Sequence, residues 1–423
     1  KGDTLASALL ANGERFVGRS FKYHRPRGIV ASGAEEPNAL MNLGEGTRAE
    51  PNQRATTTEL FEGLAARSQN HWPSLKYDVG AINSRLSRFF PAGFYYKTFI
   101  HPRAAWKHVF EPVIRQSAGL GAAPTEGDAD RYEYFYATFD VVVIGGGIAG
   151  IAAARAAAEG GAKVLLVEQT AHFGGRALVD GGTIEGMSAS AWVAAEVAAL
   201  EAMPNVTLRC RMMGAGVYDH GYLLAYERLS DHRPGDGPRH RLWRIRAGQV
   251  VVATGAIERP LSFAGNDVPG VMLASAVRDY LGLYGVSPGD RTVVVTNNDD
   301  GYRTALALHA AGLLVPVILD TRSTTTGTLP KAARDAGLLV QTGRGIAGVK
   351  GRSGVEAVQV CLQAGEGAVL ETVPCDCVAM SGGWSPVVHL WSHCGGKLVW
   401  DEAEAHFRPD PERAPTGDDG QPF

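Results

Sequence analysis

Cysteine is scarce in this sequence, with only five residues among 423, and an odd number at irregular spacing does not form a disulfide framework. This usage fits a reducing compartment. Cys375 and Cys377 are separated by one residue, which is not the spacing of a C-x-x-C redox pair or of a zinc ribbon. Cys394 lies close to His389 and His393, but this set lacks a fourth ligand. We therefore expect structural cysteines and no metal site.

An excess of charge of either sign is also absent. Lys and Arg number 41 against 44 Asp and Glu, which gives a net charge of −3 at pH 7. A general nucleic-acid binder needs a basic surface to displace counterions from phosphate, so that class is excluded. Hydrophobic residues make up 45% and charged residues 20%, which excludes wholesale disorder. The length predicts about two to four domains.

Long apolar runs are missing as well. The longest, Val141 to Ala158, is interrupted by glycines and contains Arg155, so it is too short and too broken to span a membrane. The polar start of the chain is not followed by the apolar segment of a signal peptide, and we expect a cytoplasmic protein. Because the chain opens directly on a helix predicted at residues 5–11, we also expect a fragment.

Glycine, by contrast, is abundant, with 53 residues. An apolar run at 140–144 predicts a buried strand, followed by a glycine loop, an Ala-rich helix at 151–159 and a second strand at 163–167. Parallel strands joined by a crossover helix form a βαβ unit. A helix at 189–202 and strands at 206–210, 216–228, 240–246 and 249–253 are expected next. The alternation predicts an α/β fold with two doubly wound sheets.

Gly145, Gly147 and Gly150 have the spacing of a dinucleotide-binding loop, directly after a strand and at the start of a helix. The first glycine allows a tight turn, the second lets the backbone approach a pyrophosphate, and the third permits close packing of helix on strand. The helix N-terminus attracts the phosphates. Glu168 ends the next strand, where its carboxylate would accept hydrogen bonds from an adenosine ribose and repel a 2′-phosphate. NAD or FAD is therefore favoured over NADP.

Two further segments are candidates for cofactor contacts. Gly174-Gly175-Arg176 suits a loop that passes near a pyrophosphate, although an ordinary turn with a surface arginine explains it equally well. The strand at 250–253 leads into Thr254-Gly255, the stretch at which flavoproteins with two dinucleotide domains pass from one domain to the next. No constellation of nucleophile and base accompanies these segments, so we expect no catalytic residue in this chain.

A second βαβ unit lacks the glycine loop. A strand predicted at 292–296 is followed by Asn297-Asn298-Asp299-Asp300-Gly301-Tyr302, a helix at 301–311 and a strand at 314–319. Two acids where a pyrophosphate would lie repel it, and side chains block the approach of the backbone. We expect the fold to be kept and the second dinucleotide site to be lost. The basic run Lys22–Arg27 stays open between a subunit interface, the surroundings of a cofactor and a solvated loop.

Several motifs together resemble the α subunit of heterotetrameric sarcosine oxidase, in the right order along nearly the whole chain. The quoted segments are Phe21-Lys-Tyr-His-Arg-Pro-Arg-Gly28, Glu36-Pro-Asn-Ala39, the Gly145 loop, Ala253-Thr-Gly-Ala-Ile-Glu-Arg-Pro260, Gly265-Asn-Asp-x-Pro-Gly-Val-Met272 and Ser381-Gly-Gly-Trp-Ser-Pro386. The resemblance implies a Rossmann-type fold like that of flavoproteins with two dinucleotide-binding domains, preceded by a ferredoxin-like α+β domain. Residues 1–209 contain no cysteine, so four thiolate ligands for an iron–sulfur cluster cannot be assembled there.

The resemblance also implies the reaction of the complex. Enzymes of that family oxidise sarcosine with O2 and tetrahydrofolate to glycine, 5,10-methylene-tetrahydrofolate and H2O2. They hold FAD and covalent FMN in or at the β subunit, while γ and δ subunits complete the complex. The α subunit binds NAD, and the implied contacts here are Gly145, Gly147, Ala149, Gly150, Val167, Glu168, Gln169, Gly174, Gly175 and Arg176, together with Met213, Thr254, Gly255, Gly382 and Gly383.

Four regions are expected on this basis. They are a ferredoxin-like domain without a cluster at 1–67, a connecting segment at 68–136, an NAD-binding domain at 137–286 and 371–423, and a second Rossmann-like domain with a degraded nucleotide site at 287–370. The alternative is an FAD-binding subunit of an amine or opine dehydrogenase with the same fold. Glu168 does not separate the two, because FAD and NAD present the same adenosine ribose.

Overall fold

The computed structural model describes residues 2–89, 93, 101–117, 119–233, 235, 237–363 and 366–416. The chain divides into two compact units, which are described one at a time. Unit 1 comprises residues 3–128 and 260–383, and unit 2 comprises residues 129–259 and 384–423. In the described part of the chain, no helix combines the length and the hydropathy that crossing a membrane requires.

Unit 1 begins with the predicted helix, α1 (Leu5–Ala11), and with short antiparallel strands. Thr4 caps α1, because its hydroxyl accepts the Ser7 N–H and the Ser7 hydroxyl accepts the Thr4 N–H. The remaining elements of this part are β1 (Gly18–Arg19), β2 (Pro26–Arg27), β3 (Leu40–Leu43), β4 (Glu50–Arg54), β5 (Ala66–Ser68), α2 (Ile82–Arg85) and α4 (Glu111–Ser117), with single helical turns η1 (Gly46–Arg48), η2 (Val79–Ala81), η3 (Ser87–Phe89) and η4 (Trp106–Phe110). Residues 90–92 and 94–100 of the expected connecting segment lie outside the described residues.

The second part of unit 1 is a five-stranded parallel sheet in the order β15-β22-β16-β17-β18, next to a three-stranded antiparallel sheet. The strands are β15 (Val271–Leu273), β16 (Thr292–Thr296), β17 (Ile318–Asp320), β18 (Val340–Thr342), β19 (Arg344–Lys350), β20 (Ala357–Leu362), β21 (Glu366–Pro374) and β22 (Cys377–Ser381), and the helices are α7 (Ala274–Tyr284), α8 (Asp300–Ala310) and α9 (Thr328–Asp335). Every residue of β16 is buried, as expected for a central parallel strand. The predicted second βαβ unit is therefore confirmed.

One hydrophobic core joins the two parts of unit 1. It contains Ala6 and Ile29 from the first part and Tyr280 and Val294 from the second. The hydroxyl of Tyr280 donates to the Ala31 carbonyl at 3.0 Å, so a buried polar group ties the two parts together. Segments 260–286 and 371–383, which the sequence assigns to the dinucleotide-binding domain, belong to this unit, because β15 and β22 pair with each other and β22 pairs with β16.

Unit 2 is built on a six-stranded sheet in the order β10-β7-β6-β13-β12-β11. Its strands are β6 (Arg131–Ile144), β7 (Val164–Val167), β10 (Val206–Arg209), β11 (Met212–Tyr218), β12 (Tyr222–Arg228) and β13 (Pro238–Val252). The helices are α5 (Ile148–Glu159), α6 (Ala189–Glu201) and α10 (His389–His393), with short turns η5 (Gly175–Leu178), η6 (Asp219–Gly221) and η7 (Pro411–Arg413). Short hairpins pair β8 (Thr183–Ile184) with β9 (Met187–Ser188) and β24 (Leu398–Asp401) with β25 (His406–Pro409). The distant strands β14 (Ala256–Glu258) and β23 (Trp384–Pro386) also pair in antiparallel fashion.

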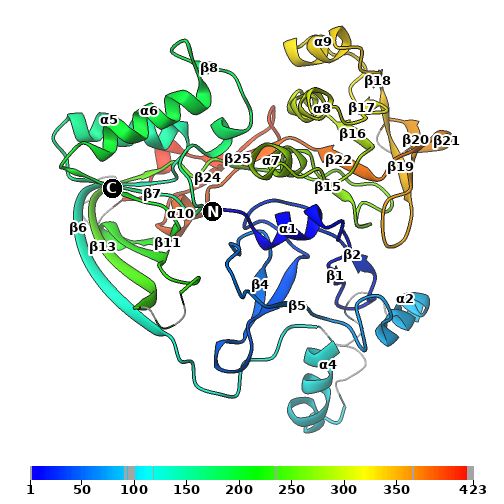
Figure 1. The fold of residues 1–423 in the computed structure, drawn as a ribbon, viewed down its shortest axis with the longest axis horizontal. Coiled ribbons are helices and arrows are strands. Elements are labelled where there is room, and N and C mark those ends of the chain that lie inside the picture. Colours follow the sequence, from blue (N-terminus) through cyan, green and yellow to red (C-terminus); the bar gives the residue numbers. More distant parts are fainter. Residues whose placement is uncertain are drawn as a thin grey trace. The chain divides into compact units, whose positions relative to one another are not determined.

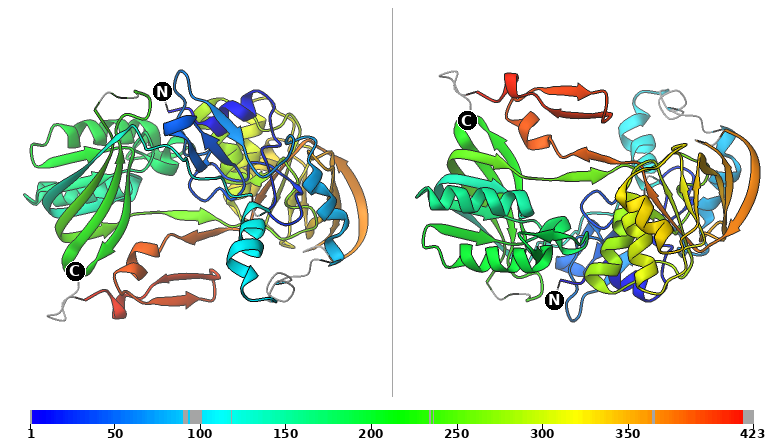
Figure 2. Two further views of the ribbon diagram at one scale, coloured as in Figure 1. Left: turned by 90° about the horizontal axis from the view of Figure 1, so that it is seen from below. Right: turned by 90° about the horizontal axis from the view of Figure 1, so that it is seen from above.

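Strands β6 and β13 are longer than the sequence predicts. They pair in parallel from Arg131 and Pro238 to Ile144 and Val252 and lie side by side throughout (Figure 2). The two strands expected at 240–246 and 249–253 are one continuous strand, because β13 is hydrogen-bonded to the antiparallel hairpin on one side and to β6 on the other. The meander and the parallel sheet therefore share a strand.

The two faces of this sheet are covered by different elements. Helices α5 and α6 lie side by side over Val143, Leu166 and the end of β13 (Figure 1). The opposite face packs Trp243 and Ile245 into a second core. Since α5 is apolar along its inner face and follows β6 directly, the chain crosses over to β7 as a βαβ unit requires.

A polar cluster closes the end of the sheet near the β12–β13 connection. His240 is buried, with its Nδ1 at the Tyr226 hydroxyl and its Nε2 2.6 Å from Asp231 Oδ1. The Arg239 guanidinium contacts the same carboxylate at 2.8 Å. Burial alone would raise the pKa of Asp231, but the hydrogen bonds and positive charges of His240 and Arg239 outweigh it and lower the pKa to about 2.

This shift predicts how acid weakens the cluster. The folded pKa of Asp231 lies below its unfolded value, so the stabilisation is complete above pH 4 and is lost as the pH falls towards 2. Asp231→Asn should lower the free energy of unfolding by about 2 kcal/mol at pH 7, and the difference from wild type should shrink between pH 4 and pH 2. Urea titrations from pH 7 to pH 3 measure both.

The exposed Asp335, paired with Lys331 at 2.5 Å, supplies the control. Asp335→Asn should change the free energy of unfolding by less than about 0.5 kcal/mol at every pH. An Asp231→Asn deficit that stays constant down to pH 3 would contradict the assignment.

Candidate functional site

The loop between β6 and α5 brings strand and helix as close as glycine allows. A Cβ on Gly145 would lie 2.2 Å from the Ala253 carbonyl oxygen, and Gly145 has a φ of +109°. A Cβ on Gly150 would lie 1.8 Å from the Gly145 carbonyl oxygen. A side chain at either position is therefore excluded by the backbone itself.

Gly147 differs from these two glycines. It is the N-cap of α5 with a φ of −74°, and a Cβ there would meet no atom of the protein within 4 Å. The first N–H groups of a helix lack intrahelical acceptors and attract negative charge. The open space beside Gly147 at this helix terminus is compatible with the expected pyrophosphate contact, which stays a prediction.

The loop is also held by the carboxylate of Glu168, which is buried. Its Oε2 accepts the Gly146 N–H and its Oε1 accepts the Thr170 N–H, each at 2.8 Å. A carboxylate has about four lone-pair positions, so about two stay available for ribose hydroxyls. The backbone of Glu168 is fixed on both sides, because its N–H donates to Arg209 and its carbonyl accepts from Met212.

Sequence reasoning missed Gly146, which occupies an unspecified position of the motif. A Cβ there would lie 2.4 Å from the Phe173 ring and 3.0 Å from the Glu168 Cβ. The run of three consecutive glycines, Gly145 to Gly147, was the available signal. Gly146 also accepts the Gly174 N–H at 2.7 Å, so it connects the glycine loop to the second predicted segment.

The Gly174–Arg176 segment runs beside the glycine loop. Gly147 and Gly174 form a parallel bridge, and a Cβ on Gly175 would lie 3.3 Å from the Gly147 Cα. The side chain of Arg176 is engaged elsewhere, with its Nη2 2.6 Å from Asp180 Oδ1 and its guanidinium over the Trp384 ring. Its expected pairing with a pyrophosphate stays a prediction.

The other predicted contacts in unit 2 lie around the same strand ends. Val167 is buried and offers only its backbone, whose carbonyl accepts the Gly145 N–H at 2.9 Å. Ala149 is exposed in the first turn of α5, Gln169 is exposed shortly after β7, and the Met213 side chain is exposed on β11. These positions are compatible with cofactor contacts, which stay predictions.

Thr254 and Gly255 hold the end of β13. The Thr254 hydroxyl donates to the Val387 carbonyl at 2.8 Å, and the Gly255 carbonyl accepts the Val387 N–H at 2.9 Å. Gly255 has a φ of +69° and open space around it. Gly382 and Gly383 follow β22 directly and belong to unit 1.

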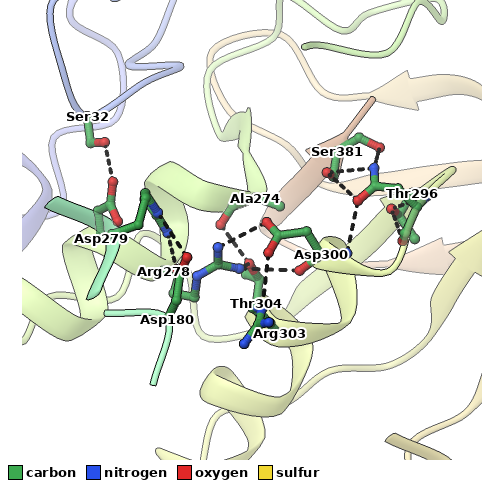
Figure 3. A network of polar contacts seen from close by, with 12 residues as sticks. Ser32, Asp180, Ala274, Arg278, Asp279, Thr296, Asp300, Arg303, Thr304 and Ser381 are labelled. Carbon is green, nitrogen blue, oxygen red and sulfur yellow. Dashed lines mark hydrogen bonds and ion pairs between the residues drawn. The ribbon is translucent and has the colours of Figure 1, made fainter. Parts of the chain in front are cut away.

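The corresponding loop of unit 1 is filled by its own side chains. The Asn298 amide donates to the Ser381 carbonyl at 3.2 Å and hydroxyl at 3.0 Å, and its oxygen accepts the Asp300 N–H at 2.9 Å. Figure 3 shows Arg278 reaching the Asp300 carboxylate, which it contacts at 3.0 Å, and the Thr304 hydroxyl. Asn298 thus takes the N–H group that a phosphate would need.

A buried acid, Asp320, ends the second strand of the βαβ unit in unit 1, near the position that corresponds to Glu168 in unit 2. Asp320 has no exposed surface, and its carboxylate accepts bonds from Arg322 at 2.8 Å and from the Tyr302 hydroxyl at 2.7 Å. Arg322 also contacts Asp299 at 2.8 Å. Burial raises the pKa of Tyr302, and the Asp320 carboxylate raises it further, so the phenol stays protonated. The acid is therefore saturated by protein groups.

The thiols of Cys375 and Cys377 in unit 1 are buried and unreactive. Burial raises the pKa of Cys375 and of Cys377 to about 12, so both stay protonated near neutral pH. His393 accepts the Val217 N–H with its Nδ1, which removes it from any ligand set with Cys394. Across the described ranges, no group of His, Cys, Asp or Glu side chains could hold a metal ion.

Comparison with known families gives two matches. The family described as Pyridine nucleotide-disulphide oxidoreductase matches residues 139–403, and the 2Fe-2S iron-sulfur cluster binding domain matches residues 1–71. The solved structure of an L-proline dehydrogenase from P. horikoshii is similar to this chain with a TM-score of 0.62 and 20% sequence identity, over 97% of this chain and 62% of that one. At this identity the likeness shows the fold alone.

Three curated relatives, each named as the α subunit of a sarcosine oxidase, are 36–49% identical to this chain. The one from Rhizobium meliloti (strain 1021) is 49% identical over 410 residues, which are 96% of this chain and 41% of the relative. The chain thus spans about two fifths of the length of these relatives. One subunit of an opine oxidase from Agrobacterium tumefaciens (strain Ach5) is 27% identical over 64% of this chain and 57% of its own.

The different surroundings of Gly147 and Gly150 predict different phenotypes. Gly147→Ala places a methyl group in open space at a φ that alanine adopts, so the thermal midpoint of the ligand-free chain should stay unchanged. Bound dinucleotide should fall about tenfold or more, because the methyl group occupies the predicted pyrophosphate position. Gly150→Ala should instead lower the thermal midpoint, since its Cβ meets the Gly145 carbonyl. Dinucleotide content and melting curves of both variants test this contrast, and normal dinucleotide content in Gly147→Ala would contradict it.

The filled loop of unit 1 predicts a purely structural role for Arg322. Arg322→Ala leaves the buried Asp320 with one charged partner fewer and should lower the free energy of unfolding by about 3 kcal/mol. Dinucleotide content should not change. Arg334→Ala, at an exposed arginine on α9, is the control in the same urea titration. Loss of dinucleotide in Arg322→Ala, at full folding, would show that this loop binds a nucleotide after all.

Proposed function

The chain belongs to the pyridine nucleotide-disulphide oxidoreductase family, with an N-terminal domain of the 2Fe-2S type, and on that premise we propose that it is the dinucleotide-binding part of a sarcosine oxidase α subunit. The observation that carries the proposal is the contrast between the two loops. The loop at Gly147 leaves open space beside a helix N-terminus, whereas the loop at Asn298 is closed by its own amide and charges. One dinucleotide per chain follows from this contrast.

In this proposal the dinucleotide is NAD, bound at Gly145–Gly150 with its adenosine ribose at Glu168. The burial of Glu168 and its two backbone donors fix the carboxylate where ribose hydroxyls would approach. A carboxylate there repels a 2′-phosphate, which favours NAD over NADP. Bound NAD could supply hydride chemistry, but no second cofactor loop among the described residues is open to receive it. The NAD is therefore structural, and the residues of this chain bind and orient it.

The chemistry of the whole complex follows from the family resemblance. We propose that the complex oxidises sarcosine with O2 and tetrahydrofolate to glycine, 5,10-methylene-tetrahydrofolate and H2O2. FAD and covalent FMN belong to the β subunit in this proposal, while γ and δ subunits complete the assembly. The relatives that carry the sarcosine oxidase name support this assignment, and this chain corresponds to about two fifths of each.

We also infer that the N-terminal domain carries no iron–sulfur cluster. Residues 1–209 contain no cysteine. Where the chain turns between 30 and 39, the buried Glu36 carboxylate accepts the N–H groups of Val30, Ala31, Asn38 and Ala39 at 2.7–3.1 Å. Burial raises the pKa of Glu36, and these backbone donors oppose that shift. A carboxylate of the protein thus takes the backbone donors of this loop, and the residues present do not fit a cluster.

The second candidate function is an FAD-binding subunit of an amine or opine dehydrogenase. The similarity to the opine oxidase relative favours it, at 27% identity over 64% of the chain. Both functions need the Gly145 loop and Glu168, so the identity of the dinucleotide separates them.

The deciding experiment is to purify the chain, record its visible spectrum, denature it and identify the released dinucleotide by chromatography and mass. We expect about one NAD per chain, no flavin absorbance and no iron by metal analysis. The Gly147→Ala variant is the matched control, since it should release about tenfold less dinucleotide. FAD in the wild type would replace the first candidate by the second, and stoichiometric iron would overturn the inference about the N-terminal domain.

A further inference from the structure

One face of the unit 2 sheet is polar and aromatic where the other is core. Along β6 and β13, Trp243 and Ile245 are at most 3% exposed, whereas Tyr134 and Tyr136 are 64% and 67% exposed. Helices α5 and α6 cover this face near the C-terminal end of β6, over Val143 and its neighbours. Towards their N-terminal ends the strands extend beyond these helices. We define the tyrosine–arginine face as the part that these two helices leave uncovered, formed by Tyr134, Tyr136, Tyr218, Tyr222, Arg244 and Arg246. At its edge the Tyr218 ring packs against the His393 ring of α10, with the ring centres 4.7 Å apart.

The strand register puts these side chains next to one another. Arg244 is opposite Tyr136 on β6, and Arg246 is opposite Tyr222 on β12. Tyr222 is in turn opposite Tyr218 on β11. Because residues two apart point to the same side of a strand, the six side chains share one face across four strands.

The tyrosines hold the two guanidinium groups in place. The Arg244 Cζ lies 4.8 Å from the centre of the Tyr134 ring and 5.4 Å from that of Tyr136, whose hydroxyl accepts an Arg244 N–H at 2.5 Å. The Arg246 Cζ lies 4.8 Å from the centre of the Tyr222 ring. Stacking on an aromatic ring orders an arginine and leaves N–H groups at its edge for a carboxylate.

The charge around Arg244 and Arg246 is positive, because Asp231, at the end of this face, is already paired with His240 and Arg239. At the positions of residues 131–138, 216–218, 222–228 and 240–246 that point to it there is no Asp or Glu, since Glu133 and Glu227 alternate to the opposite side. Within the described residues, neither Arg244 nor Arg246 forms an ion pair with a carboxylate. Tyrosine and arginine are enriched at the centres of protein interfaces, and both lose little conformational entropy here because they are already ordered.

We propose that the tyrosine–arginine face binds a carboxylate-bearing, otherwise apolar surface of another subunit of the oxidase complex, and this proposal rests on the function proposed above. A second copy of the chain is a poor occupant, because a twofold contact would set the arginines of one copy against those of the other. A carboxylate of the partner would accept the free edge of Arg244, and the tyrosine rings would cover its apolar surroundings.

The test uses the full-length α subunit co-expressed with its partner subunits. We expect Arg244→Glu with Arg246→Glu to raise the dissociation constant of the complex about 30-fold or more, as for residues at the centre of an interface. Arg244→Lys with Arg246→Lys should give a smaller increase, because lysine keeps the charge and lacks the planar fork. Mass photometry over a dilution series measures the fraction assembled.

Two controls separate the causes. Lys350→Glu with Arg352→Glu makes the same change of charge at other non-buried positions and should leave assembly unchanged. The Arg244/Arg246 variants should keep the thermal midpoint and the dinucleotide content of wild type, which shows that unit 2 is folded.

Each outcome decides the proposal. Equal assembly of wild type and the Glu variant, or an equal loss in the Lys350/Arg352 control, overturns the interface while the proposed function stands. Failure of the wild-type α subunit to assemble with any other component of a sarcosine oxidase overturns the proposed function and the interface together. A selective loss in the Arg244/Arg246 variants supports both.

Discussion

The close contact between the end of β6 and the start of α5 is the constraint on which unit 2 depends. Only glycine fits at Gly145 and Gly150, because any Cβ would meet the backbone of a neighbouring segment. Once the helix starts there, its N-terminus lies beside the end of β7, and Glu168 can hold the loop through the Gly146 N–H. The same contact leaves Gly147 facing open space. One turn of chain thus satisfies the packing of helix on strand and leaves the open space that the proposed dinucleotide needs.

The similar turn in unit 1 is filled by the protein's own groups. Its helix α8 also starts close to a strand, with Gly301 against Thr296, so the packing requirement survives. The polar groups of the loop are instead satisfied internally, by Asn298, Arg322 and Asp320. Buried polar groups need partners whether or not a ligand supplies them. Side chains and backbone groups of the protein therefore fill the loop of unit 1 in place of an empty pocket.

Local patterns predicted the central elements well, because helix caps, glycine spacing and buried apolar runs act over a few residues. The helix at 5–11 and the strand at 292–296 are confirmed at the same boundaries. The length of β6 and the continuity of β13 could not be predicted from local sequence. The burial of the residues from Tyr132 to Tyr136 depends on β13, a partner strand more than 100 residues away. Gly146 was missed for a related reason, because its constraint comes from Phe173 and Glu168. Arg176 pairs with Asp180, and the spacing of residues in the sequence does not reveal which partner an arginine contacts.

The long pairing of β6 with β13 also limits how this protein can change over evolutionary time. Thirteen pairs of residues are matched between two strands that are far apart in the sequence. A single inserted or deleted residue in one strand would turn its following side chains to the wrong side, exchanging Trp243 with its exposed neighbours. The register already shifts once, between Pro238 and His240 at the start of β13. Beyond that shift, the lengths of the two strands must change together. Relatives should vary in length at the connections between strands and keep this pair constant, which makes its register a more durable marker of descent than any side chain on it.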